Sequence, residues 1–237
     1  MVLRLNCWSG PRNVSTALMY SFRQRADTTV VDEPLYGHYL RVTGRDHPGA
    51  AEVMEAMETD GERVVQETIL GPCSTPVLFL KQMAHHLVFV DAAFLGQCRN
   101  ILLVRDPAEM LPSLAVQLPD ANLNDTGLAW QVEMAEAIVA TGETPVVLDS
   151  KVLLTDPEAA LTALCSRVGL AFDSAMLSWP AGPIREDGVW ARHWYQNVHR
   201  STGFAPYRPQ TLELPDALQP VLDEAVPLYE RLRAWAI

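Results

Sequence analysis

Short apolar runs that alternate with helical segments constrain the fold of this chain more than any other feature of its sequence. Five runs have the length and aliphatic content of buried strands: Leu3–Trp8, Thr28–Val31, Pro76–Lys81, Asn100–Arg105 and Pro145–Asp149. Helical patterns occupy much of the remaining chain: Val14–Arg25, Ala50–Glu58, Leu128–Thr141, Asp156–Gly169 and Asp216–Trp235. Because such alternation is typical of a parallel sheet wrapped by helices, the sequence predicts a three-layer α/β fold.

The composition indicates one globular domain with an acidic surface. The chain has 237 residues, 49% of them hydrophobic, and no linker-like stretch divides it, so we expect a single domain over residues 1–237. Eighteen Lys and Arg residues against 29 Asp and Glu residues give a net charge of −11. That charge argues against nucleic acid and anionic membranes as partners. A small anionic ligand is still compatible with it, because such a ligand responds to a local cluster of donors.

Targeting and cysteine patterns predict a cytoplasmic protein. Residues 1–10 contain no apolar run of signal-peptide length, and no stretch of the chain reaches the length of a transmembrane helix. The four cysteines are far apart, which predicts reduced thiols and no metal site: Cys7, Cys73, Cys98 and Cys165. The amphipathic C-terminal stretch is compatible with a homodimer contact or with packing back onto the domain.

The segment between the first predicted strand and the first predicted helix has the make-up of an anion-binding loop. The start of a helix leaves several backbone N–H groups without partners, and the helix dipole favours negative charge there. Hydroxyl groups and a guanidinium add further donors. The residues assigned to phosphate binding are Gly10, Pro11, Arg12, Asn13, Val14, Ser15 and Thr16. In a second interpretation, Asn13 or Ser15 only caps the helix.

This loop does not match the ATP-binding motif G-x-x-x-x-G-K-[ST], because it contains neither the Gly-Lys pair nor any lysine. Without that lysine, no side chain reaches the β- and γ-phosphates, and the sequence argues against ATP hydrolysis. A second candidate segment follows the predicted strand Asn100–Arg105. There Arg105 precedes Asp106 and Pro107, which are suited to start a helix, and Ser113 follows eight positions after Arg105. Pro112 predicts a kink in that helix.

Together the two segments resemble the nucleotide-binding motifs of the sulfotransferases. The first is similar to the phosphosulfate loop P-[KR]-S-G-T-[TS], with Arg12 at the basic position and Ser15 and Thr16 as the paired hydroxyls. Asn13 and Val14 replace its Ser-Gly pair. Because valine does not favour the positive φ that glycine allows, we expect a differently shaped loop. The second segment is similar to the motif R-D-P-x5-S, in which the arginine and the serine bind a 3′-phosphate.

The resemblance implies a fold and an activity. The fold would be that of the P-loop nucleoside triphosphate hydrolases, and the donor would be 3′-phosphoadenylyl sulfate (PAPS), which leaves 3′-phosphoadenosine 5′-phosphate (PAP) as product. No metal would be required, and the sulfuryl group would pass to a hydroxyl or amine of a small acceptor. The family commonly closes its site with a late basic loop, and we assign that role to four residues: Arg200, Ser201, Thr202 and Gly203.

Candidates for the chemistry follow from what sulfuryl transfer needs, which is a cation near the transferred group and a base for the acceptor's proton. Arg12 and Lys81 are the candidate cations, although a lysine that ends a strand can also extend to solvent. Glu33 is the first candidate base, since Asp32-Glu33-Pro34-Leu35-Tyr36 resembles a block of bacterial sulfotransferase-like proteins. The competing interpretation is a cap for a helix that begins at Pro34.

His85 and His86 are the alternative bases, because cytosolic sulfotransferases place a histidine shortly after the equivalent lysine and histidine titrates near neutrality. The aromatic residues between Trp179 and Pro209, among them Trp190, Trp194 and Tyr195, predict either an acceptor pocket or an aromatic core. Two alternatives to a sulfotransferase stay open at this point. One is a nucleotide-dependent kinase of related fold, and the other is a nucleotide-binding module without catalysis.

Overall fold

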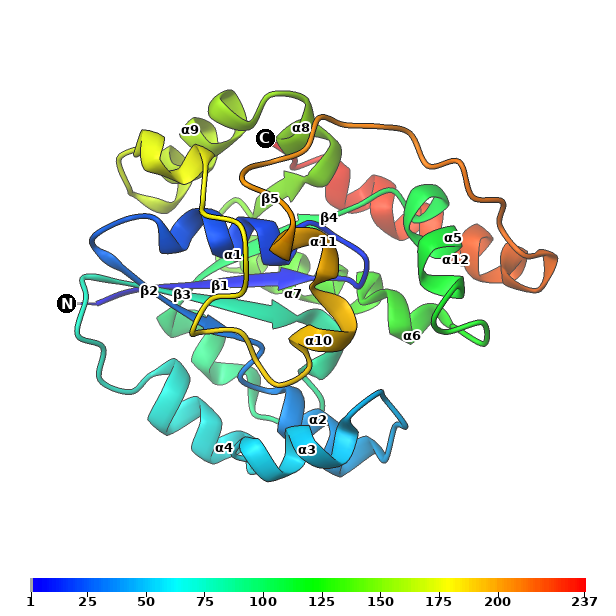
Figure 1. The fold of residues 1–237 in the computed structure, drawn as a ribbon, viewed down its shortest axis with the longest axis horizontal. Coiled ribbons are helices and arrows are strands. Elements are labelled where there is room, and N and C mark those ends of the chain that lie inside the picture. The colour runs from blue at the N-terminus through cyan, green and yellow to red at the C-terminus, as the bar shows by residue number, and fades with distance from the viewer. Residues whose placement is uncertain (1) are drawn as a thin grey trace. The chain divides into compact units, whose positions relative to one another are not determined.

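A computed structural model describes residues 2–237 of the chain. It contains one five-stranded sheet with strand order β2-β3-β1-β4-β5, flanked by helices, so the predicted α/β fold class is confirmed. The strands are β1 Leu3–Ser9, β2 Thr28–Asp32, β3 Val77–Met83, β4 Arg99–Val104 and β5 Val146–Asp149. Strands β2 and β3 pair in parallel (Figure 1), and so do β4 and β5. No helix in residues 2–237 is long and apolar enough to cross a membrane.

The described chain divides into two compact units, each built from three segments. The first unit contains residues 2–7, 15–100 and 173–204, and the second contains residues 8–14, 101–172 and 205–237. Both units therefore use residues from the N-terminal and C-terminal parts of the sequence, which explains why no linker is visible in it. The prediction of a single domain stays a prediction.

The first unit packs helix α1 (Ser15–Arg23) against β2 and β3. Its apolar face is buried, and the ring of Phe22 stacks on Phe79 of β3 with 4.2 Å between centroids. The remaining elements of the unit are α2 Tyr36–Thr43, α3 Ala50–Ala56, α4 Gly61–Arg63, η1 Val64–Ile69, η2 Ala84–His86, η3 Ala92–Gln97, η4 Ser174–Leu177, α10 Ala191–Trp194 and α11 Gln196–His199.

The second unit packs helix α12 (Gln219–Arg233) against α5 (Pro107–Ala115) and α7 (Leu128–Ala140). Its other elements are α6 Leu123–Thr126, α8 Ser150–Thr155, α9 Pro157–Val168 and η5 Asp216–Leu218. Side-chain caps start several of these helices, because an aspartate or asparagine oxygen accepts the otherwise unpaired N–H groups of the first turn. Asp106 caps α5 in this way, as its sequence position predicted.

Two predicted details differ from the structure, and a third is untested. Helix α2 begins at Tyr36 after the N-cap residue Leu35, which makes no side-chain cap, so the interpretation that Asp32 or Glu33 caps a helix at Pro34 is wrong. Strand β3 continues to Met83, which places Lys81 inside the strand instead of at its end. Helix α5 continues through Pro112 as far as Ala115, and the kink that Pro112 predicts stays a prediction.

Candidate functional site

Three residues that the sequence predicted for nucleotide binding lie together in the second unit. The Arg12 Nε–H group donates to Ser113 Oγ at 3.0 Å. Arg105, from the end of β4, donates through Nη1 to the backbone oxygen of Arg12. The structure thus joins the loop after β1 with the turn after β4, which the two motifs place about a hundred residues apart. Of the other predicted loop residues, Ser15 and Thr16 begin helix α1 of the first unit.

The loop is left-handed at the basic position of the sulfotransferase motif and not at the position where that motif has glycine. Its left-handed residue is Arg12, with φ of 52°, and Val14 is not among the residues with positive φ. The Asn13 side chain holds the backbone that follows Arg12. Its Oδ1 accepts the N–H of Val14 at 2.8 Å, and its Nδ2 donates to Leu103 O at 3.0 Å. A Cβ on Gly10 would lie 2.3 Å from the carbonyl oxygen of Thr126, so only glycine fits there. Val14 thus does not adopt the positive φ that glycine allows, and the difference in loop shape from the family stays a prediction.

A buried glutamine that the sequence did not single out supports the same loop. Gln131 of α7 is fully buried, and its side-chain amide donates to Trp8 O at 2.9 Å and to Leu103 O at 3.0 Å. Gln131 therefore connects the end of β1 with β4 at the start of the loop. In the sequence, a glutamine within an apolar helix was the available sign of this role.

The two arginines lack full compensation of their charge. Burial lowers the pKa of Arg12, and the neighbouring Arg105 lowers it further. In residues 2–237 no carboxylate forms an ion pair with Arg12, whereas Arg105 Nε lies 3.8 Å from Glu109 Oε2. The Tyr207 hydroxyl in turn donates to the other oxygen of Glu109. Two partly buried cations, of which only Arg105 has a carboxylate partner, favour binding of an anion.

Lys81 is the centre of a second cluster, which lies in the first unit. In the β2–β3 register Asp32 is the partner of Lys81, whose side chain is 2% exposed. Its Nζ donates to Asp32 Oδ1 at 3.0 Å, to Tyr195 Oη at 2.8 Å and to Glu33 Oε1. The interpretation of Lys81 as a lysine that extends to solvent is therefore wrong. Burial opposes its charge, but Asp32 and Glu33 outweigh burial and raise the pKa of Lys81.

Glu33 sits directly after β2 in a left-handed conformation, with φ of 40°. Its N–H donates to the backbone oxygen of Lys81 at 2.8 Å, which extends the strand pairing by one residue. Burial raises the pKa of the Glu33 carboxyl, the charge of Lys81 opposes this, and the charge of Asp32 adds to it. Non-glycine residues in this backbone region are concentrated at functional sites, and Arg12 is a second example in this chain.

The two candidate histidines form the short turn η2 after β3. The ring of His86 lies between those of Tyr36 and Tyr39, at centroid distances of 4.9 and 4.5 Å. Burial lowers the pKa of His85 to about 3 and that of His86 well below its usual value. The imidazoles are thus neutral near pH 7 and much weaker bases than free histidine. Within residues 2–237 the buried Nδ1 atoms of both have no hydrogen-bond partner, and that of His86 lies 3.9 Å from Glu33 Oε2.

Replacing His86 with phenylalanine is expected to make folding less sensitive to acid. The unfolded chain takes up protons on its histidines below about pH 6.5, whereas the folded chain keeps His86 neutral. His86 therefore leaves the free energy of unfolding unaffected by pH above pH 6.5. Below that pH it lowers the free energy of unfolding by up to about 1.4 kcal/mol per pH unit. Urea unfolding at pH 7 and pH 5 should show a smaller loss for His86→Phe than for the wild type. Equal losses would contradict a buried neutral His86.

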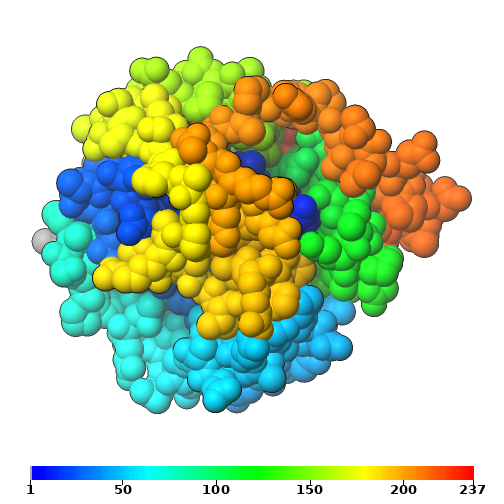
Figure 2. Space-filling model, viewed as in Figure 1, coloured from blue at the N-terminus to red at the C-terminus, as the bar shows by residue number. Residues whose placement is uncertain are grey.

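The aromatic residues of the late segment belong mainly to the core. Trp190 and Tyr195 are buried against Tyr36, Tyr39 and other residues of α2 and α3, and Trp194 packs at the margin of the same cluster. Figure 2 shows the segment around α10 lying directly against the segment around α3. The core interpretation is thus confirmed for Trp190 and Tyr195.

The residues predicted to close the site over a 3′-phosphate have differing surroundings. Ser201 accepts a hydrogen bond from Trp179 Nε1 at 3.1 Å and donates to Val198 O at 2.8 Å. Gly203 forms a β-bridge with Ser178, whereas Arg200 and Thr202 are exposed. Ser201 and Gly203 thus stabilise the segment itself, and the role of these four residues in nucleotide binding stays a prediction.

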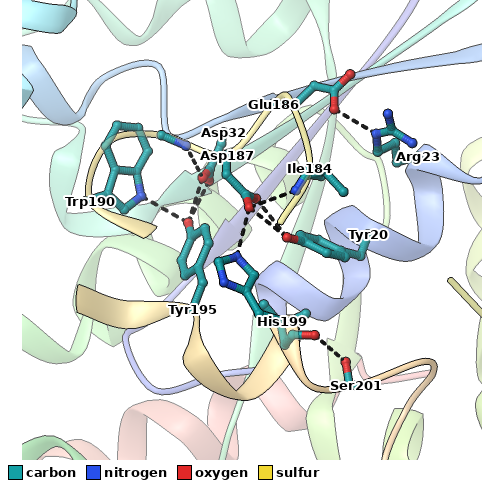
Figure 3. A network of polar contacts seen from close by, with 12 residues as sticks. Tyr20, Arg23, Asp32, Ile184, Glu186, Asp187, Trp190, Tyr195, His199 and Ser201 are labelled. Atoms are coloured by element: carbon teal, nitrogen blue, oxygen red, sulfur yellow. Dashed lines mark hydrogen bonds and ion pairs between the residues drawn. The ribbon is translucent and has the colours of Figure 1, made fainter. Parts of the chain in front are cut away.

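Sequence reasoning also missed a polar network beside the Lys81 cluster. Asp187 accepts hydrogen bonds from the Tyr20 hydroxyl at 2.8 Å and from the N–H of Ile184 at 3.1 Å, and it pairs with His199 Nε2 at 2.9 Å (Figure 3). The following N–H, of Gly188, points at Asp32 Oδ2 at 3.5 Å. Neither Tyr20 nor Asp187 lies in a motif, so no pattern in the sequence indicated them.

Comparison with known proteins identifies the family. The model of the sulfotransferase domain family matches residues 3–236, and the chain belongs to that family. Three solved structures share the fold at 11–18% sequence identity. The sulfotransferase domain of the Synechococcus PCC 7002 olefin synthase covers 93% of both chains with a TM-score of 0.58. A sulfotransferase from Alicyclobacillus acidocaldarius covers 99% of this chain and 95% of its own with a TM-score of 0.57.

Two curated proteins of Arabidopsis thaliana are similar over most of this chain. Branched-chain-amino-acid aminotransferase-like protein 1 is 39% identical over 231 residues, and branched-chain-amino-acid aminotransferase-like protein 2 is 37% identical over 230 residues. Each match covers 97% of this chain but 41% of the relative. The chain thus spans about two-fifths of the length of these relatives, whose names describe the longer proteins.

Proposed function

We propose that this sulfotransferase-family protein transfers a sulfuryl group from PAPS to a hydroxyl or amine group of a small acceptor. One observation carries the proposal, namely the convergence of Arg12, Arg105 and Ser113 in the second unit. These are the residues that the two motifs assign to a nucleotide with two phosphate groups. Their juxtaposition is what such a ligand requires, and neither motif predicts it alone.

The donors at this cluster suit a phosphate. Ser113 Oγ accepts from Arg12, and within residues 2–237 no acceptor takes its hydroxyl hydrogen, which is thus available to a ligand. The Arg12 guanidinium has no carboxylate partner there, and its neighbour Arg105 raises the cost of its charge. Bound phosphate oxygens would offset this cost through charged hydrogen bonds. Arg105 and Ser113 would hold the 3′-phosphate, and the loop from Gly10 to Thr16 the 5′-phosphosulfate.

The proposed base is Glu33. A general base works best when its pKa lies close to the working pH, and burial raises the pKa of Glu33 in that direction. His85 and His86 are less suited, because burial lowers their pKa values far from neutrality. PAPS, when bound, supplies an activated sulfuryl group, while the protein positions the acceptor, removes its proton and stabilises negative charge. Arg12 is the proposed cation for that charge.

The test is sulfuryl transfer from ³⁵S-labelled PAPS in the presence of EDTA. The purified protein is incubated with sets of small hydroxyl and amine compounds, and labelled products and released PAP are quantified. We expect formation of PAP that depends on the acceptor and does not depend on magnesium. Magnesium-dependent phosphoryl transfer from ATP would indicate the kinase instead. Binding of PAP without transfer to any acceptor would indicate a nucleotide-binding module without catalysis.

A further inference from the structure

We propose that Asp32 and Tyr195 are positioning residues for the base. They hold Lys81 against one oxygen of Glu33, Oε1, and so leave the other oxygen, Oε2, to take the proton of the acceptor. This inference rests on the proposed function, in which Glu33 is the base. It assigns Lys81 a role different from that of a cation at the sulfuryl group.

The contacts of Lys81 leave it no hydrogen for a ligand. An ammonium group has three N–H donors. Those of Lys81 face three acceptors, on Asp32, Glu33 and Tyr195, and its side chain is buried. A cation that contacts a transferred sulfuryl group would have to give up one of these partners while buried, which is costly. Lys81 is thus placed to orient Glu33.

Tyr195 connects the parts of this cluster. Its hydroxyl donates to Asp32, with distances of 2.9 Å to Oδ1 and 2.7 Å to Oδ2, and accepts from Lys81 Nζ at 2.8 Å. Trp190 Nε1 donates to the same oxygen at 3.0 Å (Figure 3). A hydroxyl with one donated and two accepted hydrogen bonds has no remaining freedom to rotate. Trp190 and Asp32 therefore fix Tyr195, and Tyr195 with Asp32 fixes Lys81.

The two oxygens of Glu33 have different surroundings. Oε1 accepts from Lys81, whereas Oε2 lies 3.9 Å from the Nδ1 atom of the neutral His86. That separation is too long for a hydrogen bond between them, so His86 does not occupy Oε2. The titratable groups that face Glu33 come from five places in the unit: Asp32 in β2, Lys81 in β3, Tyr36 in α2, His86 in η2 and Tyr195 after α10.

The charges of Asp32, Glu33 and Lys81 together favour uptake of one proton by Glu33. With both carboxylates ionised, Asp32, Glu33 and Lys81 carry a net charge of −1 in a buried environment, and a proton on Glu33 makes the cluster neutral. In the reaction, the proton of the acceptor O–H group passes to Glu33 Oε2 while the acceptor oxygen forms a bond to sulfur. The bond from sulfur to the donor's phosphate oxygen breaks, and its electron pair stays on that oxygen. The acceptor's sulfate ester and PAP are the products.

The test follows the titration of Glu33 directly by NMR of protein with ¹³C-labelled glutamate side chains, assigned with Glu33→Gln. Asp32→Asn removes a negative charge beside Glu33 and is expected to lower its titration midpoint by about one pH unit or more. The pH at which the rate of PAPS turnover falls on the acidic side of its pH profile should shift by the same amount as the Glu33 midpoint. Tyr195→Phe removes a hydroxyl that lowers the pKa of Glu33 through hydrogen bonding, and it is expected to raise the titration midpoint of Glu33. Asp187→Asn is the matched control, because it alters a buried aspartate of the neighbouring network that does not contact Lys81.

The proposal is overturned if the Glu33 midpoint is unchanged in both folded variants, or if Asp187→Asn shifts it equally. It is also overturned if the midpoint shifts while the acidic side of the pH profile of turnover stays in place. Calorimetric titration of each variant with PAP reports separately on the donor site, whose proposed residues include neither Asp32 nor Tyr195. Normal PAP binding with no turnover in the wild type would count against the proposed function. A shifted Glu33 midpoint would then show that Asp32 and Tyr195 set the pKa of Glu33, without a role in sulfuryl transfer.

Discussion

Replacing Arg105 with alanine is expected to weaken the binding of PAP by about 10- to 150-fold. Loss of a charged hydrogen-bond partner costs about 1.5–3 kcal/mol, and each 1.4 kcal/mol is tenfold in affinity. The substitution also removes the hydrogen bond from Arg105 to the backbone oxygen of Arg12, which holds the left-handed residue of the loop. Isothermal titration calorimetry with PAP measures the effect.

Arg231→Ala is the matched control for this experiment. Arg231 belongs to the same unit and forms an exposed ion pair with Glu136. Its replacement removes the same charge from the protein and should leave the dissociation constant for PAP nearly unchanged. If Arg105→Ala bound PAP as tightly as the wild type, or if both variants lost affinity equally, the assignment of Arg105 to a phosphate would be wrong.

Replacing Glu33 with glutamine is expected to lower the rate of sulfuryl transfer by about 10²- to 10⁴-fold, which is the usual contribution of a general base. The amide keeps the shape of the side chain and an oxygen for Lys81, but it cannot take a proton. PAP binding should stay close to that of the wild type, because the proposed phosphate residues lie elsewhere in the chain. Single-turnover release of PAP from PAPS with a saturating acceptor separates the two effects.

Glu55→Gln provides the comparison, since Glu55 is exposed on helix α3 of the same unit. That variant should retain the wild-type rate. Full activity of Glu33→Gln would exclude Glu33 as the base and return attention to His85. Equal losses of turnover and of PAP affinity would instead indicate that the substitution disturbs the donor site.

The sequence predicted that Arg12, Arg105 and Ser113 would lie together, because each half of this cluster is local. Arg12 and Arg105 each follow a strand, and a strand that leads into a helix can be recognised from about 15 consecutive residues. Chain order and the parallel sheet then bring the two turns to the same end of neighbouring strands. The positive φ of Arg12 was not predictable, because arginine has no preference for it and the surrounding contacts impose it.

The Lys81 cluster shows where prediction from sequence failed. The apolar run of β3 ends at Leu80, yet the strand continues to Met83, because Lys81 finds buried partners on the adjacent strand and on Tyr195. Tyr195 is 163 positions from Asp32, and such a distant contact leaves no trace in local periodicity. A lysine and two carboxylates each look solvent-exposed in a sequence, and only their mutual pairing permits burial.

Titration of the wild-type protein with PAP and with ATP under identical conditions, in EDTA and at low salt, tests the central claim most directly. If Arg12, Arg105 and Ser113 form a site for an adenosine nucleotide with a 3′-phosphate, PAP should bind at least about tenfold more tightly than ATP, a difference of about 1.4 kcal/mol. Added salt should weaken its binding, since charged contacts carry it. Equal affinity for both nucleotides, or a preference for ATP, would contradict the account.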